Sequence, residues 1–312
     1  MIALWWFGCF NLDSLIYNPI HCSDVNEDTC EGIEEPFDRA CLSCDEPYDW
    51  QRDYDWIPGT LEEGQTVRPI DPSLITPVPI ATDDGEATLD AYFIASHGED
   101  PLLADVTLVY NHGRYLGIEH YQPRLRFLHE AGYNVFVWDF RGYGKSVPNQ
   151  VPTTDQQITD AGTVIAEARK RAPNLERVAV YAYSLGTFPA VHMLDEDICT
   201  LLLESSFPSL ADAAEFGTRL SLPEQFLSSG QLDNREQLAT YAGPVFGMIG
   251  TEDEVVPGPE VQREMVEAGG GPSELWVAEG ASHGLAGGGI PEDMGLTMYF
   301  DQMRNFVEEY CP

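Results

Sequence analysis

Residues 178–186 read Val-Ala-Val-Tyr-Ala-Tyr-Ser-Leu-Gly, an apolar run that ends in a serine flanked by a short turn. The segment that follows, from Thr187 to Asp195, is compatible with a helix. A strand, a sharp turn with serine and a helix form the context of the G-x-S-x-G motif, in which a strained turn lifts the serine hydroxyl out of the sheet. Here Ala182 replaces the first glycine. Ser184 is therefore a candidate nucleophile, although serine also favours this position as a plain helix cap.

Short apolar runs alternate with helical stretches on both sides of this motif. The predicted strands are residues 106–110, 134–138, 178–182, 200–203, 244–249 and 275–278. The predicted helices are residues 119–131, 155–171, 184–195, 209–216, 259–268 and 294–309. Ahead of them, residues 78–95 predict a hairpin that turns at Asp84 and Gly85. Continuous apolar strands that alternate with helices predict a doubly wound, mostly parallel α/β sheet with helices on both faces, over residues 77–312.

A nucleophilic serine needs a base to take its proton and a carboxylate to orient that base. In a doubly wound sheet, such partners lie in loops at the carboxyl ends of later strands. Asp253 follows the strand at 244–249, and His283 follows the strand at 275–278. The order Ser, Asp, His differs from the orders of the two other common serine-triad folds. We therefore predict Ser184 as the nucleophile, Asp253 as the orienting acid and His283 as the base.

Both partners of the serine have competitors in the sequence. Asp253 lies between Glu252 and Glu254, but its spacing from Gly250 and the Val-Val-Pro that follows favour it. His283 is favoured because it follows the last predicted strand in a loop of small residues. The competing histidines are at positions 21, 97, 112, 120, 129 and 192.

An oxyanion hole needs two hydrogen-bond donors aimed at the reacting oxygen. The serine turn supplies the backbone N–H of Leu185. The loop after the strand at 106–110 is predicted to supply the second N–H, from Arg114 or alternatively from Tyr115. His112 is predicted to support this loop. Further along, Asp139 and Arg141 are predicted to form an internal ion pair that holds their own loop.

These motifs together resemble the α/β-hydrolase superfamily, and most closely its small serine hydrolases with a His-Gly loop and little or no lid. The resemblance spans residues 78–306 and rests on the serine turn and on residues 111–113, 139–146, 204–207, 250–257 and 282–284. Two residues depart from the family pattern. Ala182 replaces a glycine with the next smallest residue, and Arg114 replaces a small polar residue of the His-Gly loop.

The predicted reaction is hydrolysis of a small-molecule carboxylic ester through an acyl-serine, which needs no metal and no organic cofactor. Tyr115 and Tyr183 are predicted to bind the substrate. The segment between Ser206 and Tyr241 is too short for a large lid, which predicts an open site. A peptidase or acyltransferase of the same fold is an alternative. An alternative from another class is a non-catalytic envelope binding protein on a hydrolase scaffold.

The charge of the chain limits its partners. Among 312 residues, 52 are acidic and 16 basic, which gives a formal net charge of −36. Such a surface repels nucleic acid and anionic membranes. No run of 18 apolar residues is present, so the sequence contains no membrane-spanning stretch. Because salt screens the repulsion among the carboxylates, a saline or halophilic source is a working hypothesis, against an acidic protein with no special habitat.

The first 76 residues differ from the rest of the chain. Residues 1–9 end in Gly-Cys, as a bacterial lipoprotein cleavage site does, which predicts an exported protein with a lipid anchor at Cys9. Against this, Trp6 occupies a position where leucine is usual, and no basic residue precedes the apolar run. Residues 10–76 are acidic, rich in cysteine and irregular, and predict an extension that wraps on the core or forms a stalk.

The cysteines of this extension admit several interpretations. They lie at positions 22, 30, 41 and 44, with Cys199 and Cys311 far downstream. An exported protein would form disulfides from these six, in one of 15 connectivities. The spacing suits zinc poorly, and residues 24–35 match a calcium loop only in part because Thr29 stands where the loop needs glycine. The sequence leaves the pairing and the oligomeric state open.

Overall fold

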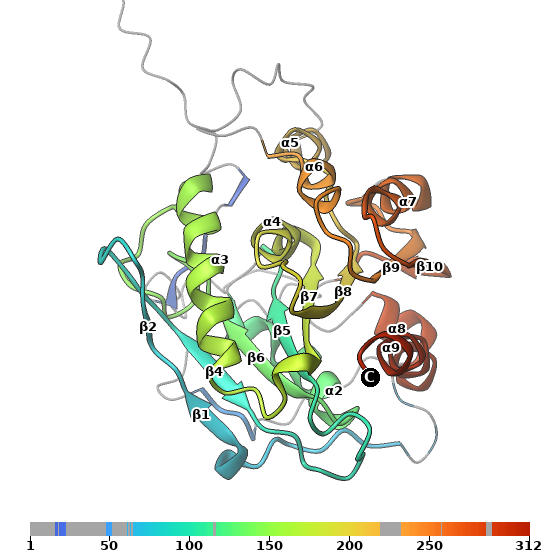
Figure 1. Cartoon of the computed structure of the whole chain (residues 1–312), viewed down its shortest axis with the longest axis horizontal. Helices are drawn as coiled ribbons and strands as arrows, with labels where there is room; N and C mark the ends of the chain where they lie inside the picture. Colours follow the sequence, from blue (N-terminus) through green and yellow to red (C-terminus); the bar gives the residue numbers. More distant parts are fainter. Residues whose placement is uncertain are drawn as a thin grey trace, which may run out of the picture.

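A mostly parallel sheet forms the centre of the molecule (Figure 1). The computed structural model describes residues 16–17, 19–22, 48–51, 61, 63, 65–114, 117–218, 232–256, 258–284 and 289–312. Within them the main sheet has eight strands in the order β1-β4-β6-β5-β7-β8-β9-β10. The strands are β1 (Ile75–Pro77), β4 (Ala91–Ile94), β5 (Thr107–Asn111), β6 (Asn134–Trp138), β7 (Val178–Tyr183), β8 (Ile198–Glu204), β9 (Val245–Glu252) and β10 (Ser273–Ser282).

The strand directions confirm the predicted doubly wound sheet. From β6 to β10, neighbouring strands pair in parallel, and β4 pairs antiparallel with both β1 and β6. The predicted hairpin is the separate pair β2 (Ile80–Ala81) and β3 (Thr88–Leu89), which turns at Gly85 with a φ of 69°. Strand β1 begins before residue 77, so the sheet starts inside the predicted extension.

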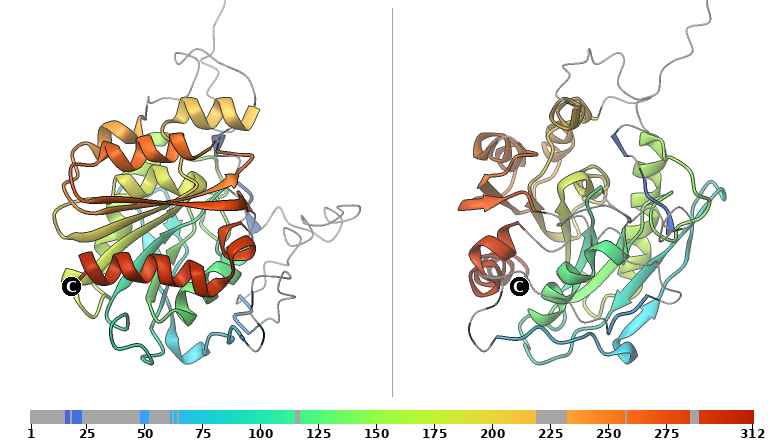
Figure 2. Two further views of the ribbon diagram at one scale, coloured as in Figure 1. Left: turned by 90° about the vertical axis from the view of Figure 1, so that its right-hand side faces the viewer. Right: turned by 180° about the vertical axis from the view of Figure 1, so that it is seen from behind.

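Helices cover both faces of the sheet (Figure 2). The α-helices are α2 (Ile118–Glu130), α3 (Thr154–Arg169), α4 (Thr187–Val191), α5 (Leu210–Thr218), α6 (Asn234–Leu238), α7 (Pro259–Ala268), α8 (Ile290–Met294) and α9 (Leu296–Tyr310). The short 3-10 helices are η4 (Pro72–Leu74), η5 (Leu175–Arg177) and η6 (Ser184–Gly186). The left view shows α2 and α9 on one side of the sheet and α4 and α7 on the other.

Two hydrophobic clusters correspond to these two faces. Successive side chains of a strand point to opposite faces, and β5 divides accordingly. Val109 packs in the cluster that includes α3, α4 and α7, whereas Leu108 and Tyr110 pack in the cluster that includes α2 and α9. Burial on both faces explains why these strands are continuous apolar runs in the sequence.

The described parts of the extension pack on the core. Tyr48 and Trp50 belong to the same hydrophobic cluster as α2, and Tyr17 belongs to the other. The backbone of Gly144 bonds to the extension twice, accepting from Cys22 N at 2.7 Å and donating to Ile20 O at 3.1 Å. The predicted extension therefore contributes to the core in these parts.

Two of the predicted disulfide cysteines pair with each other. Cys199 at the start of β8 is bonded to Cys311, which follows α9. Cys22 is also disulfide-bonded, and its partner lies outside the described residues. Cys9, the cysteines at 30, 41 and 44, and the calcium-like stretch at 24–35 also lie outside them.

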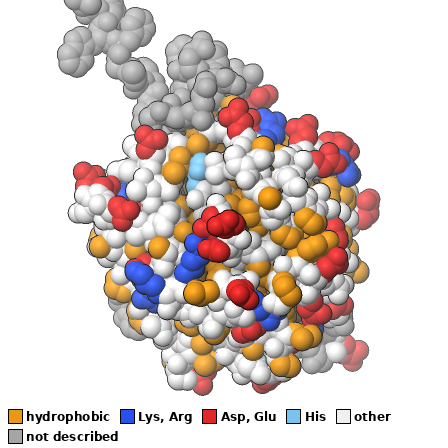
Figure 3. All heavy atoms as spheres, in the orientation of Figure 1, with side chains coloured by type: hydrophobic (Ala, Val, Ile, Leu, Met, Phe, Trp, Pro, Cys, Tyr) orange, Lys and Arg blue, Asp and Glu red, His pale blue; other side chains and the backbone are white. Residues whose placement is uncertain are grey.

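The described surface agrees with the acidic composition. Acidic side chains gather along the edge that carries α7 in Figure 3. No helix in the described ranges is both long and apolar enough to cross a bilayer.

Candidate active site

The candidate site lies where the order of the parallel strands reverses. Strand β5 lies between β6 and β7 in the sheet. The chain passes from β5 to β6 on one side, and the strands from β7 to β10 follow on the other side of β5. Crevices outside the carboxyl ends of strands at such a switch point are the usual ligand sites of open α/β sheets. The loop after β5 and the turn after β7 meet at this place.

The turn after β7 is strained at the serine. Ser184 has a φ of 54°, and Ser205, with 51°, is the other non-glycine residue with a positive φ in the described ranges. Non-glycine residues in this region cost about 1–3 kcal/mol and cluster at functional sites. The turn is also crowded, because a Cβ atom on Gly186 would lie 2.2 Å from the carbonyl oxygen of Asn111. Ala182 itself is fully buried and pairs with Asn111 in the sheet.

Three predicted residues form one hydrogen-bonded chain. Ser184, Asp253 and His283 are each the first residue after a strand, namely β7, β9 and β10. His283 Nε2 lies 3.1 Å from Ser184 Oγ, and His283 Nδ1 lies 3.0 and 3.1 Å from the two carboxylate oxygens of Asp253. All three are buried, with 6, 4 and 7% of the surface of Ser184, His283 and Asp253 exposed. The sheet thus brings the predicted serine, base and acid together.

Asp253 is held in its charged form. Burial alone would raise the pKa of this carboxyl, but the hydrogen bond with His283 and the N–H of Val256 outweigh burial and lower the pKa below its ordinary value. The N–H groups of Val255 and Val256 donate to Asp253 Oδ1 at 2.9 and 2.7 Å. An ionised Asp253 accepts the His283 Nδ1–H, which leaves Nε2 free to accept the serine proton.

The loop after β5 lies against the serine turn. Arg114 is half-buried at its end, and Tyr115 lies outside the described residues. His112 is buried, stacks on Phe140 at 3.8 Å between ring centroids and donates from Nδ1 to Gly113 O at 2.6 Å. Burial lowers the pKa of His112 to about 3, so the ring stays neutral. His112 therefore supports the loop as predicted, and the loop contacts the turn that carries Leu185.

Asp139 fixes the far end of the same loop. Its carboxylate accepts from Ile118 N, the first residue of α2, at 2.6 Å, from Lys145 N at 3.1 Å and from the Tyr48 hydroxyl at 3.0 Å. The predicted ion pair between Asp139 and Arg141 is wrong, because the Arg141 guanidinium points to other carboxylates. Arg141 bonds to Asp160 and Asp84 at 2.9 and 3.0 Å.

Comparisons with solved structures identify the fold. The structural match with the esterase Pf2001 of Pyrococcus furiosus covers 76% of this chain and 92% of the esterase, with a TM-score of 0.61 at 24% identity. The structure of Est1E of Butyrivibrio proteoclasticus with ferulic acid covers 75% and 99%, with a TM-score of 0.58 at 18% identity. The chain has the α/β-hydrolase fold.

Sequence matches to this fold cover part of the chain. A family model described as serine aminopeptidase, S33, matches residues 104–202. The uncharacterized protein YfhR of Escherichia coli K12 is 26% identical over 195 residues, which are 60% of this chain and 66% of YfhR, just under two thirds of that protein. The family model and the likeness to esterase structures support a hydrolase. Asp253 and His283 lie beyond the matched range of the family model, so their assignment rests on the geometry of the site.

The position of Tyr183 in the structure differs from its predicted substrate-binding role. Its side chain is 2% exposed, and its hydroxyl lies 3.0 and 2.5 Å from the backbone oxygens of His283 and Gly284. The prediction that Tyr183 binds substrate is therefore corrected, because the side chain is buried against the histidine loop. Tyr115 stays a prediction.

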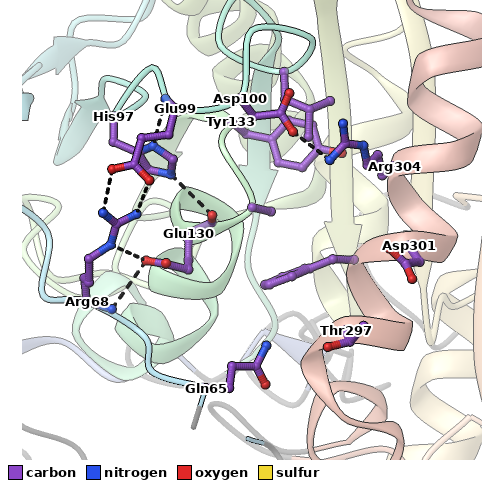
Figure 4. Close-up of a pocket in the computed structure, with 13 residues that line it drawn as sticks. Gln65, Arg68, His97, Glu99, Asp100, Glu130, Tyr133, Thr297, Asp301 and Arg304 are labelled. Carbon is purple, nitrogen blue, oxygen red and sulfur yellow. Dashed lines mark hydrogen bonds and ion pairs between the residues drawn. The ribbon is translucent and has the colours of Figure 1, made fainter. Parts of the chain in front are cut away.

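A cavity of about 350 Å³ lies outside this site (Figure 4). It is bordered by Leu103 and Tyr133, which precede β5 and β6, and so lies at the amino ends of these strands. Both of its arginines pair with carboxylates that also line it. Arg68 bonds to Glu99 and Glu130 at 2.7 and 3.2 Å, and Arg304 bonds to Asp100 at 2.7 Å. None of the three triad residues lines this cavity.

Proposed function

We propose that this chain is a serine hydrolase that cleaves small carboxylic esters through an acyl-serine intermediate. The observation that carries the proposal is the hydrogen-bonded chain from Ser184 through His283 to Asp253 at the carboxyl edge of the sheet. A side chain hydroxyl in contact with an imidazole, which is itself oriented by a carboxylate, is the arrangement of an activated nucleophile.

The reaction follows from these three groups. Ser184 Oγ attacks the ester carbonyl while its proton passes to His283 Nε2, and the backbone N–H groups of Leu185 and Arg114 stabilise the oxyanion. His283 then gives the proton to the leaving alkoxide, and the acyl group remains on Ser184. Water, deprotonated by His283, then attacks the acyl-serine, and His283 returns this proton to Ser184 Oγ as the carboxylic acid leaves. Asp253 stabilises the imidazolium in both halves of the cycle.

An assay with p-nitrophenyl acetate and butyrate tests the ester specificity. We expect saturable hydrolysis by the wild type and background rates for Ser184→Ala. Because the surface is strongly acidic, both proteins are assayed at low salt and at about 2 M NaCl, where screening removes the repulsion between carboxylates. Hydrolysis that is negligible in both buffers would contradict the proposal.

An aminopeptidase is the second candidate, because the family model that matches residues 104–202 is described as a serine aminopeptidase. The same serine and histidine would then form the acyl-enzyme from an amide. The kcat/KM values for an amino-acid p-nitroanilide and for the p-nitrophenyl ester of the same amino acid distinguish the two functions. When acylation limits the rate for both substrates, we expect an esterase to turn over the p-nitrophenyl ester and not the p-nitroanilide.

The proposal includes an exported location with a lipid anchor at Cys9. The disulfides at Cys22 and between Cys199 and Cys311 support it, since structural disulfides persist mainly in oxidising compartments. Expression in a bacterial host followed by membrane fractionation tests the anchor. We expect the wild type in the detergent phase and Cys9→Ser in the aqueous phase. Equal partitioning of the two proteins would contradict the anchor.

A further inference from the structure

Beneath the triad lies a buried ion pair that the proposed mechanism does not use. The Arg124 guanidinium on α2 donates from Nη1 to the two carboxylate oxygens of Glu204, at 2.9 and 2.8 Å. The two side chains are 2% and 0% exposed. Removing two charges from water costs several kcal/mol per ion, and a well-packed apolar pair is often as stable. Stability alone therefore does not explain why an ion pair is buried at this position.

Further hydrogen bonds fix Glu204 at the end of β8. The hydroxyl groups of Tyr181 and Tyr299 both donate to its Oε2, the latter at 3.1 Å, and the two hydroxyl oxygens are 2.5 Å apart. Tyr181 belongs to β7 and Tyr299 to α9, so the carboxylate joins a strand and a helix to Arg124. This network leaves the guanidinium little freedom to move.

The guanidinium in turn lies on the residue that precedes the nucleophile. Its Cζ atom is 4.0 Å from the centre of the Tyr183 ring, which is cation–π geometry. Burial raises the pKa of the Tyr183 phenol, and the charge of Arg124 acts in the opposite direction. The positive charge of Arg124 thus offsets part of the effect of burial on this hydroxyl.

The Tyr183 hydroxyl contacts the backbone of the histidine. It lies 3.0 Å from His283 O and 2.5 Å from Gly284 O, and the rings of Tyr183 and His283 are 5.4 Å apart. A contact chain therefore runs from the ion pair through Tyr183 to His283. On the basis of the proposed function, we propose that Arg124 and Glu204 act as positioning residues, which hold His283 at hydrogen-bond distance from Ser184 through the Tyr183 hydroxyl.

Tyr183→Phe tests this proposal because it removes one hydroxyl and keeps the ring. We expect kcat to fall about 10-fold with KM within about twofold of wild type, since small misplacements of a base reduce turnover and leave substrate binding intact. Tyr133→Phe is the matched control. Tyr133 is also fully buried, its hydroxyl has no hydrogen-bond partner among the described residues, and it lines the cavity in Figure 4 outside the site. Its kcat should equal that of wild type.

The pair is tested by Arg124→Met with Glu204→Gln, which removes both charges together and leaves no uncompensated ion. We expect a similar 10-fold loss of kcat, and little further loss when the same pair is changed in a Tyr183→Phe background, because both act through one hydroxyl. The pair variant also provides the test if Tyr183→Phe does not fold by circular dichroism.

The outcomes are distinct. Wild-type kcat in folded Tyr183→Phe, or in the folded pair variant, overturns the positioning role. If the pair variant in the Tyr183→Phe background loses a further 10-fold in kcat, the route through Tyr183 is overturned. No ester hydrolysis by the wild type contradicts the proposed function itself, and the positioning role with it.

Discussion

His283 Nε2 lies 3.1 Å from Ser184 Oγ, although 99 residues separate them along the chain. The contact exists because β7 and β10 end at the same edge of the sheet, with β8 and β9 between them. The imidazole is useful as a base only while Asp253 holds the proton on Nδ1. Removing the Asp253 charge should therefore cost activity without moving the ring.

Asp253→Asn should lower kcat about 10³–10⁴-fold, because an amide can hold the imidazole in the wrong tautomer. Glu252→Gln, an exposed carboxylate one residue earlier, is the matched control and should keep wild-type kcat. Steady-state assays with p-nitrophenyl butyrate measure both. Equal losses in the two variants would show that general negative charge, rather than the contact with His283, matters.

Gly186→Ala should disrupt the serine turn. The added Cβ would lie 2.2 Å from Asn111 O and 2.7 Å from His112 O, and these backbone atoms cannot swing aside. A shift of about 1 Å at the nucleophile should lower kcat/KM about 100-fold. Gly162→Ala in α3 is the control, since its Cβ has no neighbour within 4 Å. That change should raise stability by about 0.5–1 kcal/mol and leave kcat/KM unchanged. Full activity of Gly186→Ala would contradict the close packing of the turn.

The sequence was sufficient to predict the sheet and the triad because both depend on local patterns. All six predicted strands are present, and Ser184, Asp253 and His283 follow strand ends, where side chains of a parallel sheet converge. Ala182, which replaces a glycine of the family pattern, is fully buried at the crowded strand end. Apolar periodicity and the order of the motifs therefore predict the fold.

Side-chain direction and pairing could not be predicted in this way. Tyr183 was predicted to bind substrate, but its ring is buried against Arg124, which lies 59 positions earlier in the sequence. Arg124 and Glu204 are separated by 80 positions, and no local pattern links them. The one available signal was charge within buried elements, because charged side chains are rarely fully buried unless paired. Six cysteines allow 15 connectivities, so the pairing of Cys199 with Cys311 could likewise not be predicted.

Acid should destabilise the protein through His112. Burial places the pKa of folded His112 at about 3, below its value of 6.5 in the unfolded chain, so the unfolded state takes up the proton first as pH falls. Stability is present above pH 6.5 and lost progressively toward pH 3, by about 4–5 kcal/mol in total. Urea unfolding at pH 7 and at about pH 4.5 should show a smaller loss for His112→Gln than for wild type. His129 and His192, whose pKa values are also lowered, contribute equally to both proteins. Identical losses would contradict a neutral, buried His112.

The Cys199–Cys311 disulfide should stabilise the fold by constraining the unfolded chain. It closes a loop with a sequence separation of 112, for which the chain-entropy estimate is about 4–5 kcal/mol and measured effects are about 2–5 kcal/mol. The double variant Cys199→Ala, Cys311→Ala should therefore unfold at lower urea than wild type in oxidising buffer. The difference should shrink under strong reductant. Equal midpoints in oxidising buffer would contradict a stabilising crosslink.

Covalent labelling by a fluorophosphonate probe tests whether Ser184 is an activated nucleophile, because the probe reacts with such a serine whatever the substrate. We expect stoichiometric labelling of wild type, no labelling of Ser184→Ala and strongly slowed labelling of His283→Ala. The labelled peptide should carry the adduct on Ser184. A folded wild-type protein that takes up no label, or equal labelling of wild type and Ser184→Ala, would contradict the assignment of Ser184 as the nucleophile.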